Sequence, residues 1–276
     1  MVQTAKAPKP PKPGTLASKA DRHHCYEEAV QCVEAEIDFV DDQYKRIRGK
    51  RATVLREDFC GTANTSCEWI RRRKTNQAVG VDLDDEVLDW GRANNVGKLK
   101  HQQQERIELV KEDVRSVERN ADVILAMNFS YQIFKDRKGL CDYFRSVLAT
   151  LNDNGVLFID AFGGYESYRA IKEKTKYKKF AYTWDQHEYD PITNEMLCYI
   201  HFSFKDGSKL KRAFSYEWRM YTLPELREIL EDAGFKNITV YWEGTDEETG
   251  EGNGEYTPAT EGSDDPAWIC YISAEK

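Results

Sequence analysis

Acidic side chains follow three short apolar stretches in the first half of this 276-residue chain. They are Glu57-Asp58, Asp82 and Glu112-Asp113. The carboxyl ends of parallel strands meet at one edge of an open sheet, which is where such sheets bind ligands. Carboxylates at that edge can accept hydrogen bonds from ribose hydroxyls and from an exocyclic amine. The pattern therefore predicts a nucleoside-type ligand.

The turn after the first apolar stretch contains a single glycine. It reads Phe59-Cys60-Gly61-Thr62-Ala63, whereas a dinucleotide site needs the pattern G-x-G-x-x-G. Those glycines let the backbone and a helix N-terminus approach a pyrophosphate. The turn therefore disfavours nicotinamide cofactors and favours a nucleoside without phosphate.

Apolar stretches alternate with amphipathic segments from residue 53 to residue 162. Near-continuous apolar runs are typical of parallel strands that are buried on both faces. The alternation predicts an α/β fold in which helices cover both faces of a parallel sheet. Strands are expected at 53–58, 77–82, 107–112, 121–127 and 156–162, and helices at 64–73, 84–94 and 137–151.

The pattern changes in residues 165–221, which are rich in aromatic side chains and lack helical spacing. We expect an inserted antiparallel β region here, acting as a lid and substrate-binding part. The basic run 169–179 is interpreted as a solvated segment that leads from helix to strand. Strands are expected at 180–189, 195–204 and 210–221.

A helix is expected between Thr222 and Gly234, because Thr222 and Glu225 form a capping box and Gly234 ends it. Two final strands are expected at 237–242 and 267–274, with the last one antiparallel at the sheet edge. Residues 243–266 between them hold nine acidic residues and no lysine or arginine, which predicts an acidic loop.

The N-terminal region divides into two parts. Residues 1–20 are rich in proline and lysine, which predicts a disordered basic tail. Residues 21–50 are expected to hold one amphipathic helix, because apolar side chains from Tyr26 to Ile47 recur at steps of three and four. Residues 21–276 are expected to form one domain.

Taken together, these motifs resemble those of class I S-adenosylmethionine-dependent methyltransferases of the small-molecule type. The acid and Cys-Gly-Thr core at 57–62 resemble the first motif, and Val79–Asp84 the second. Val110–Val114, Leu125–Asn128 and Met220–Phe235 match further family segments in order and spacing. The chain departs from the family at Phe59 and Ala63, which replace the outer glycines of the first motif.

The resemblance implies a Rossmann-like seven-stranded, mostly parallel sheet with an antiparallel last strand, plus an inserted antiparallel β lid. It also implies S-adenosyl-L-methionine as the cofactor and methyl transfer as the activity. Asp82 would hold the ribose hydroxyls, Leu83 would lie against the adenine, and Asp113 would meet the adenine amine. The other cofactor residues implied are Glu57, Phe59, Cys60, Gly61, Thr62, Val114, Met127 and Asn128.

Each acid also has a structural interpretation. Asp82 can equally cap the following helix, although Asp84 is better placed for that role. Glu57 can satisfy backbone amides of its own turn, and Asp113 can form a turn. These alternatives stay open at the level of the sequence.

The motifs do not specify the molecule that accepts the methyl group. In-line transfer from a sulfonium needs positioning of the nucleophile, and a general base only for some acceptors. No residue stands out as that base, so the catalytic residues stay unassigned. Tyr131 and Arg219 are the candidate substrate contacts, while His187 and His201 face either a pocket or solvent.

Composition narrows the remaining classes of function. The net charge of −8 is concentrated in the acidic segment, so the rest of the chain is nearly neutral and nucleic-acid binding is not favoured. The seven scattered cysteines have no zinc-site spacing, which predicts reduced thiols, no metal and a cytoplasmic location. No apolar run is long enough to span a membrane.

The leading hypothesis is an N- or O-methyltransferase for a small molecule; the alternatives are an RNA or protein methyltransferase and a non-catalytic cofactor-binding module.

Overall fold

The computed structural model describes residues 8–246, 248–250 and 252–276 and divides the chain into two units. The smaller unit contains the described residues up to Gln31, together with Gln132–Lys135 and Gly164–Tyr221. The larger unit contains Cys32–Tyr131, Asp136–Gly163 and Thr222–Lys276. Each is described by itself.

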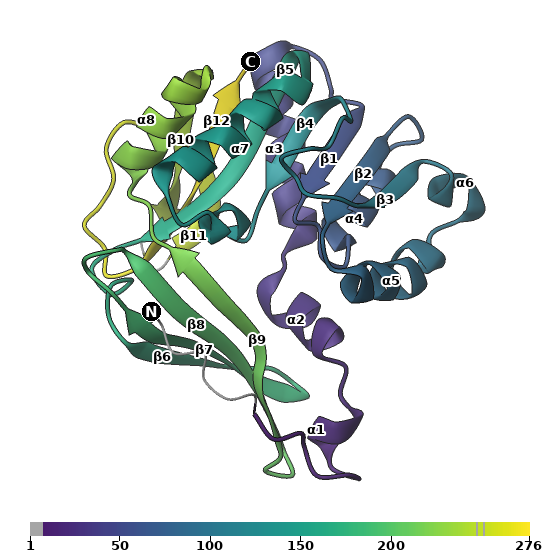
Figure 1. The fold of residues 1–276 in the computed structure, drawn as a ribbon, viewed down its shortest axis with the longest axis vertical. Coiled ribbons are helices and arrows are strands. Elements are labelled where there is room, and N and C mark those ends of the chain that lie inside the picture. Colours follow the sequence, from purple (N-terminus) through teal and green to yellow (C-terminus); the bar gives the residue numbers. More distant parts are fainter. Residues whose placement is uncertain (1–7, 247, 251) are drawn as a thin grey trace. The chain divides into compact units, whose positions relative to one another are not determined.

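The larger unit is built on an eight-stranded sheet in the order β11-β10-β12-β5-β4-β1-β2-β3, which can be followed in Figure 1. Strands β1 to β5 are mutually parallel, and β12 is antiparallel to both of its neighbours, β5 and β10. The strands are β1 (Val54–Asp58), β2 (Gln77–Asp82), β3 (Ile107–Lys111), β4 (Ala121–Ala126), β5 (Leu151–Gly163), β10 (Lys236–Thr245), β11 (Gly252–Ala259) and β12 (Trp268–Glu275). The strand order reverses between β1 and β4, so the carboxyl ends of these strands form a topological switch point.

The predicted Rossmann-like α/β class is confirmed, but the edge of the sheet differs from the prediction. Part of the expected acidic loop forms β11, which pairs antiparallel with β10 and makes the sheet eight-stranded. Tyr256 of β11 packs on Tyr271 at a centroid separation of 4.5 Å, and this contact anchors a strand whose composition is polar. The last strand lies between β10 and β5 and is therefore inside the sheet.

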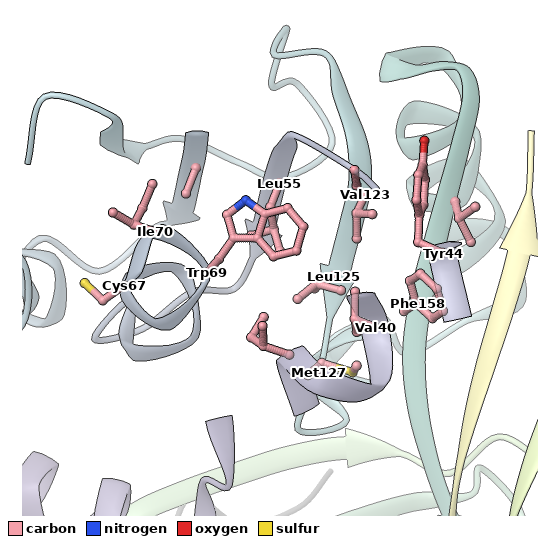
Figure 2. Close-up of a cluster of buried hydrophobic side chains, with 14 of the residues drawn as sticks. Val40, Tyr44, Leu55, Cys67, Trp69, Ile70, Val123, Leu125, Met127 and Phe158 are labelled. Atoms are coloured by element: carbon pink, nitrogen blue, oxygen red, sulfur yellow. The ribbon is translucent and has the colours of Figure 1, made fainter. Parts of the chain in front are cut away.

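Helices cover both faces of this sheet. Trp69 and Tyr44 come from two helices and pack with Leu55, Val123 and Phe158 in one apolar layer, as Figure 2 shows. On the other face, Tyr143 reaches the end of β1. The helical segments are α3 (Val33–Arg48), α4 (Asn64–Arg72), α5 (Asp85–Asn94), η1 (Val96–Lys98), α6 (His101–Gln104), α7 (Arg137–Thr150) and α8 (Leu223–Ala233). This packing is what fixes the strand ends that carry the acids.

The smaller unit contains a separate antiparallel sheet in the order β6-β7-β8-β9. Its strands are β6 (Ile171–Lys176), β7 (Phe180–Tyr189), β8 (Glu195–Phe204) and β9 (Lys209–Arg219). Three of them match the predicted strands closely. The fourth, β6, was expected to be a solvated connecting segment; it forms because its backbone pairs with β7, although five of its six side chains are exposed.

The single helix expected over residues 21–50 is wrong. It is interrupted at Gln31, whose backbone is extended, and gives α2 (Arg22–Val30) and α3. The apolar periodicity is continuous, but Tyr26 of α2 packs on Phe214 of the smaller unit, whereas Tyr44 of α3 belongs to the core of the larger one. Periodicity identifies a buried face without saying which core buries it.

The expected disordered tail also differs from the structure over residues 8–20; residues 1–7 lie outside the described residues. A short helix, α1 (Leu16–Lys19), is held by hydrogen bonds from the Leu16 amide to Asp206 Oδ2 (2.8 Å) and from the Ala17 amide to Ser208 Oγ (3.0 Å). Composition alone did not reveal these long-range partners. The short segment η2 (Ser130–Ile133) is the remaining helical element described.

All seven cysteines are free, and six of them are buried. Burial raises the pKa of the Cys60 thiol well above its usual range, so this group is an inert packing residue. In the part of the chain that the structure describes, no helix has both the length and the apolar character needed to cross a bilayer.

Candidate cofactor site

The turn after β1 has an unusual backbone conformation. Phe59, Gly61 and Ala63 all have positive φ, at 58°, 53° and 56°. Only glycine adopts this left-handed region freely, and other residues there cost about 1–3 kcal/mol each. Phe59 and Ala63 thus keep a glycine-like path at the two positions where the chain departs from the family pattern.

Packing on one side of the turn holds Phe59 in this conformation. Its ring lies 5.6 Å from the ring of Tyr143, and the Tyr143 hydroxyl donates to Asp58 Oδ2 at 2.9 Å. Asp58 is paired with Arg56 at 2.8 Å, and both side chains are buried. Asp58 is therefore part of the support of the turn.

On its other side the turn packs directly against a helix. A Cβ added at Gly91 would lie 2.6 Å from the carbonyl oxygen of Thr62, so α5 must have glycine there. The same carbonyl accepts a hydrogen bond from Asn95 Nδ2 at 3.0 Å. The side chains of Cys60 and Thr62 are buried, so these two residues could contact a ligand only through their backbone atoms.

Glu57 caps the helix that follows the turn. Its Oε2 accepts hydrogen bonds from the Ser66 amide (2.9 Å) and the Ser66 hydroxyl (2.5 Å). The N-cap residue, Ala63, has no side chain for this task. Burial raises the pKa of Glu57 to about 7 in spite of these hydrogen bonds, and the charge of Glu36 adds to the rise.

Asp82 at the end of β2 organises two turns. Its Oδ2 accepts from the Gly61 amide at 2.8 Å and its Oδ1 from the Asp84 amide at 3.0 Å. Asp84 is the cap of α5, since its Oδ1 accepts from the Glu86 amide at 2.9 Å. Each oxygen of Asp82 keeps a further lone pair. The neighbouring Leu83 is 61% exposed, and its contact with an adenine stays a prediction.

Asp113 after β3 forms a turn. Its carboxylate accepts from the Arg115 amide (2.9 Å) and is paired with the Arg115 guanidinium (2.6 Å). These interactions with Arg115 lower the pKa of Asp113. The next residue, Val114, is buried. The predicted contact of Asp113 with an adenine amine would thus have to share a carboxylate that Arg115 already holds.

The loop after β4 is strained and is supported by one acid. Asn128 and Phe129 have φ values of 56° and 58°. Their amides donate to the two oxygens of Asp160 on β5, at 2.8 and 2.9 Å. Met127 before them is buried, 7% exposed. Burial raises the pKa of Asp160 to about 7, although both amides favour its charged form.

Glu36, Glu57 and Asp160 together form a cluster of buried acids, which we call the acid cluster. Glu36 interacts electrostatically with both of the others, and burial raises its own pKa to about 6. Its Oε2 is buried without a hydrogen-bond partner among the described residues. An unpartnered buried carboxylate oxygen is costly unless a ligand completes it.

The sequence analysis did not single out Glu36 and Asp160. The signals were present: Asp160 interrupts the apolar run Val156–Phe162, and Glu36 lies next to Ile37 on the buried side of a helix. Buried polar residues are more informative than exposed ones.

Two predicted substrate contacts have other surroundings. Tyr131 is fully buried and its hydroxyl donates to the Asp160 carbonyl oxygen at 2.8 Å, which is a packing role; its contact with a substrate stays a prediction. Arg219, in the smaller unit, lies over the Tyr221 ring at 4.3 Å. Among the described residues, no group of three histidine, cysteine or acidic side chains is arranged to hold a metal ion.

Comparison with solved structures identifies the fold. No family model and no curated protein matches the sequence. A structure of an S-adenosylmethionine-dependent methyltransferase from Clostridium acetobutylicum is similar over 92% of this chain and 96% of its own, with 17% identity and a TM-score of 0.66. The amino pentose methyltransferase CalS10 from Micromonospora echinaspora, with S-adenosylmethionine bound, matches over 92% and 95% at 14% identity and a TM-score of 0.64. Streptomyces venezuelae DesVI matches over 92% and 98%, at 14% identity and a TM-score of 0.66. The chain therefore has the fold of class I S-adenosylmethionine-dependent methyltransferases.

Proposed function

We propose that this chain is an S-adenosylmethionine-dependent methyltransferase that acts on a nitrogen or oxygen nucleophile of a small molecule. The observation that carries the proposal is the acid cluster together with Asp82 at the carboxyl ends of the parallel strands. Similar structures include methyltransferases, one of them with this cofactor bound, and open sheets bind ligands at this switch point.

The charge of the cofactor fits the residues present. S-adenosylmethionine carries a sulfonium and an ammonium, so it suits a site where buried carboxyls lack a cation. Glu57 and Asp160 have pKa values raised to about 7 by burial, and a nearby positive charge would favour their ionised forms. Glu36 Oε2 supplies an acceptor that no described group uses. We infer that the acid cluster holds the positively charged end of the cofactor.

The nucleoside end is assigned to the edge formed by β1, β2 and β3. Asp82 would accept the ribose hydroxyls with its remaining lone pairs, and Leu83 would cover the adenine. Asp113 and Val114 would meet the adenine edge. The backbone of the first turn would lie along the cofactor, as would the loop after β4; these are residues Phe59, Cys60, Gly61, Thr62, Met127 and Asn128.

When bound, the cofactor supplies the activated methyl group. The chain's own residues bind and orient it, and hold an acceptor in line with the bond that breaks. We assign no general base. An amine acceptor needs none if it arrives neutral, and CalS10 is described as an amino pentose methyltransferase, so an amine on a small polar molecule is our first choice. A substrate-binding role for the smaller unit and a cytoplasmic location remain predictions.

Calorimetric titration tests the cofactor. Both S-adenosylmethionine and its demethylated product should bind, and Asp82→Ala should weaken binding while Glu231→Gln, an exposed acid on α8, should not. If neither ligand gives a heat of binding, the proposal that this chain is a methyltransferase is refuted. Methyl transfer from labelled cofactor to a panel of amino sugars and matched hydroxyl sugars would then separate nitrogen from oxygen acceptors.

A further inference from the structure

The smaller unit has a large cavity on one face of its four-stranded sheet. Side chains alternate along β7, so Tyr182 and Trp184 join the aromatic cluster under α2 while Thr183 and Asp185 line the cavity. The cavity has a volume of about 1070 Å³ and is bounded by strands β6 to β9 and by residues of the segment 8–15. All of its lining residues belong to this unit.

Positive charge dominates this cavity. Seven lysine and arginine side chains line it, against two carboxylates. Two of the seven are lysines of the segment 8–15, and the other five come from β6 and β9: Lys172, Lys174, Lys209, Lys211 and Arg212. The chain as a whole has a net charge of −8, so this concentration is local.

Both carboxylates are already engaged. Asp185 is 2% exposed, accepts from His201 Nε2 at 3.0 Å and is paired with Lys172 at 2.9 Å. Burial opposes ionisation of Asp185, but the bonds from Lys172 and His201 outweigh it and lower its pKa. Asp206 accepts from the amides of Leu16 and Ser208. Neither acid is left to neutralise the other cations.

Three lysines of the cavity stand without a counter-ion. Across the residues that the structure describes, no carboxylate lies within ion-pair distance of Lys174, Lys209 or Lys211. Gathering like charges in one concave surface is unfavourable by itself and raises the local concentration of anions. Such an arrangement favours an anionic ligand.

The floor of the cavity is pre-organised. The Arg212 amide donates to His201 Nδ1 at 2.9 Å, so the proton of this imidazole is on Nε2 and points at Asp185. Arg212 has a φ of 50°, and its guanidinium lies 4.5 Å from the centroid of the Tyr199 ring. Arg212 is thus strained, and its amide is fixed by the partly exposed His201, which is itself bonded to the buried Asp185; strained residues of this kind cluster at functional sites.

We propose that this cavity binds a small molecule that carries two or more phosphate-type negative charges. The site uses residues of the smaller unit alone and goes beyond the proposed methyl transfer. Its volume is near the upper end of small-molecule pockets, about 300–1,000 Å³. The segment 8–15 contributes to its wall and is joined to the sheet through Asp206 and Ser208, which favours a compact ligand over a long polymer.

The probe is inorganic diphosphate, titrated calorimetrically into the full-length protein at constant ionic strength. We expect binding about tenfold tighter than that of inorganic phosphate, because a second charge meets further lysines. Lys174→Gln with Lys211→Gln should weaken diphosphate binding about tenfold. The control pair Lys178→Gln with Lys205→Gln removes the same charge from exposed positions outside the cavity and should leave the affinity unchanged.

Thermal melting of both double variants checks that each is folded, and both should bind S-adenosylmethionine like the parent protein. The proposal is overturned if diphosphate gives no heat, if both pairs weaken it equally, or if a short single-stranded RNA binds more tightly than diphosphate. These readouts measure binding at the smaller unit. A failure of the methyltransferase proposal would appear separately, as loss of cofactor binding.

Discussion

Cofactor binding should release protons from the acid cluster. Glu57 and Asp160 have pKa values raised to about 7 by burial, so near neutral pH each is about half protonated in the free protein. A bound sulfonium and ammonium would favour the ionised carboxylates and bring these pKa values down. At pH 7 the complex should therefore release about half a proton from each group, or about one in all.

The pH dependence of the affinity follows from the same shift. At pH 6 about a tenth of each carboxyl is ionised and at pH 8 about nine tenths, so each group lowers the affinity about tenfold on going from pH 8 to pH 6. Both together give about a hundredfold, or about 2.7 kcal/mol. Glu36, with a pKa of about 6, adds a smaller effect in the same direction.

Calorimetry measures this release directly. Titrating S-adenosylmethionine at pH 7 in two buffers with different ionisation enthalpies gives the number of protons released. Glu57→Gln keeps an acceptor for the Ser66 amide and should reduce the release by about half a proton, while the exposed Glu231→Gln should not change it. An affinity that is flat between pH 6 and pH 8, with no proton released, would refute the assignment of the acid cluster to the charged end of the cofactor.

Three further predictions concern the free protein and the turns around Asp82. Burial raises the pKa of Glu57 from 4.5, its value in the unfolded chain, to about 7 in the folded protein, so the folded state binds more protons. The free energy of unfolding should therefore fall as the pH rises from about 4.5 to 7. A rise of the unfolding free energy over that window, measured by urea titration, would contradict the prediction. Asp82→Ala should weaken cofactor binding by about 1–3 kcal/mol, because hydrogen bonds are lost. Asp84→Ala should mainly lower the free energy of unfolding, by about 1 kcal/mol, because it removes a helix cap. If both variants weaken cofactor binding equally, Asp82 has only a structural role. Gly91→Ala should destabilise the protein by about 1–3 kcal/mol, because the added Cβ would clash with the Thr62 carbonyl oxygen. Alanine is otherwise the better helix former, so a higher melting temperature of the variant would show that the turn can move to accept the Cβ.

Local patterns predicted those parts of the fold that depend on local forces. The bounds of β1 to β4 lie within one residue of those predicted from the sequence, and the pattern of a strand buried on both faces is clearest in β4. Thr222 caps α8 and Gly234 ends it in a left-handed conformation, as capping chemistry requires. The spacing of acids after consecutive strands likewise indicated one ligand-binding edge.

Long-range pairing decided what the patterns missed. Strand β11 exists because β10 offers it a partner, and β6 because β7 does; neither has an apolar run of its own. The interruption between α2 and α3 has the same origin, since two different cores bury the two halves of one periodic pattern.

The candidate site shows the same division. The first turn, Asp82 at the end of β2, and the acids that end β1 or follow β3 could be identified from the sequence, because the sheet itself places side chains at strand ends. Only the tertiary structure brought Glu36 of α3 close enough to interact electrostatically with both Glu57 of β1 and Asp160 of β5. It also showed that Phe59 and Ala63 keep a glycine-like backbone, since Tyr143, far along the chain, packs against the turn. Burial is a property of the folded molecule, and burial is what raises the pKa values of the acids on which the proposed function depends.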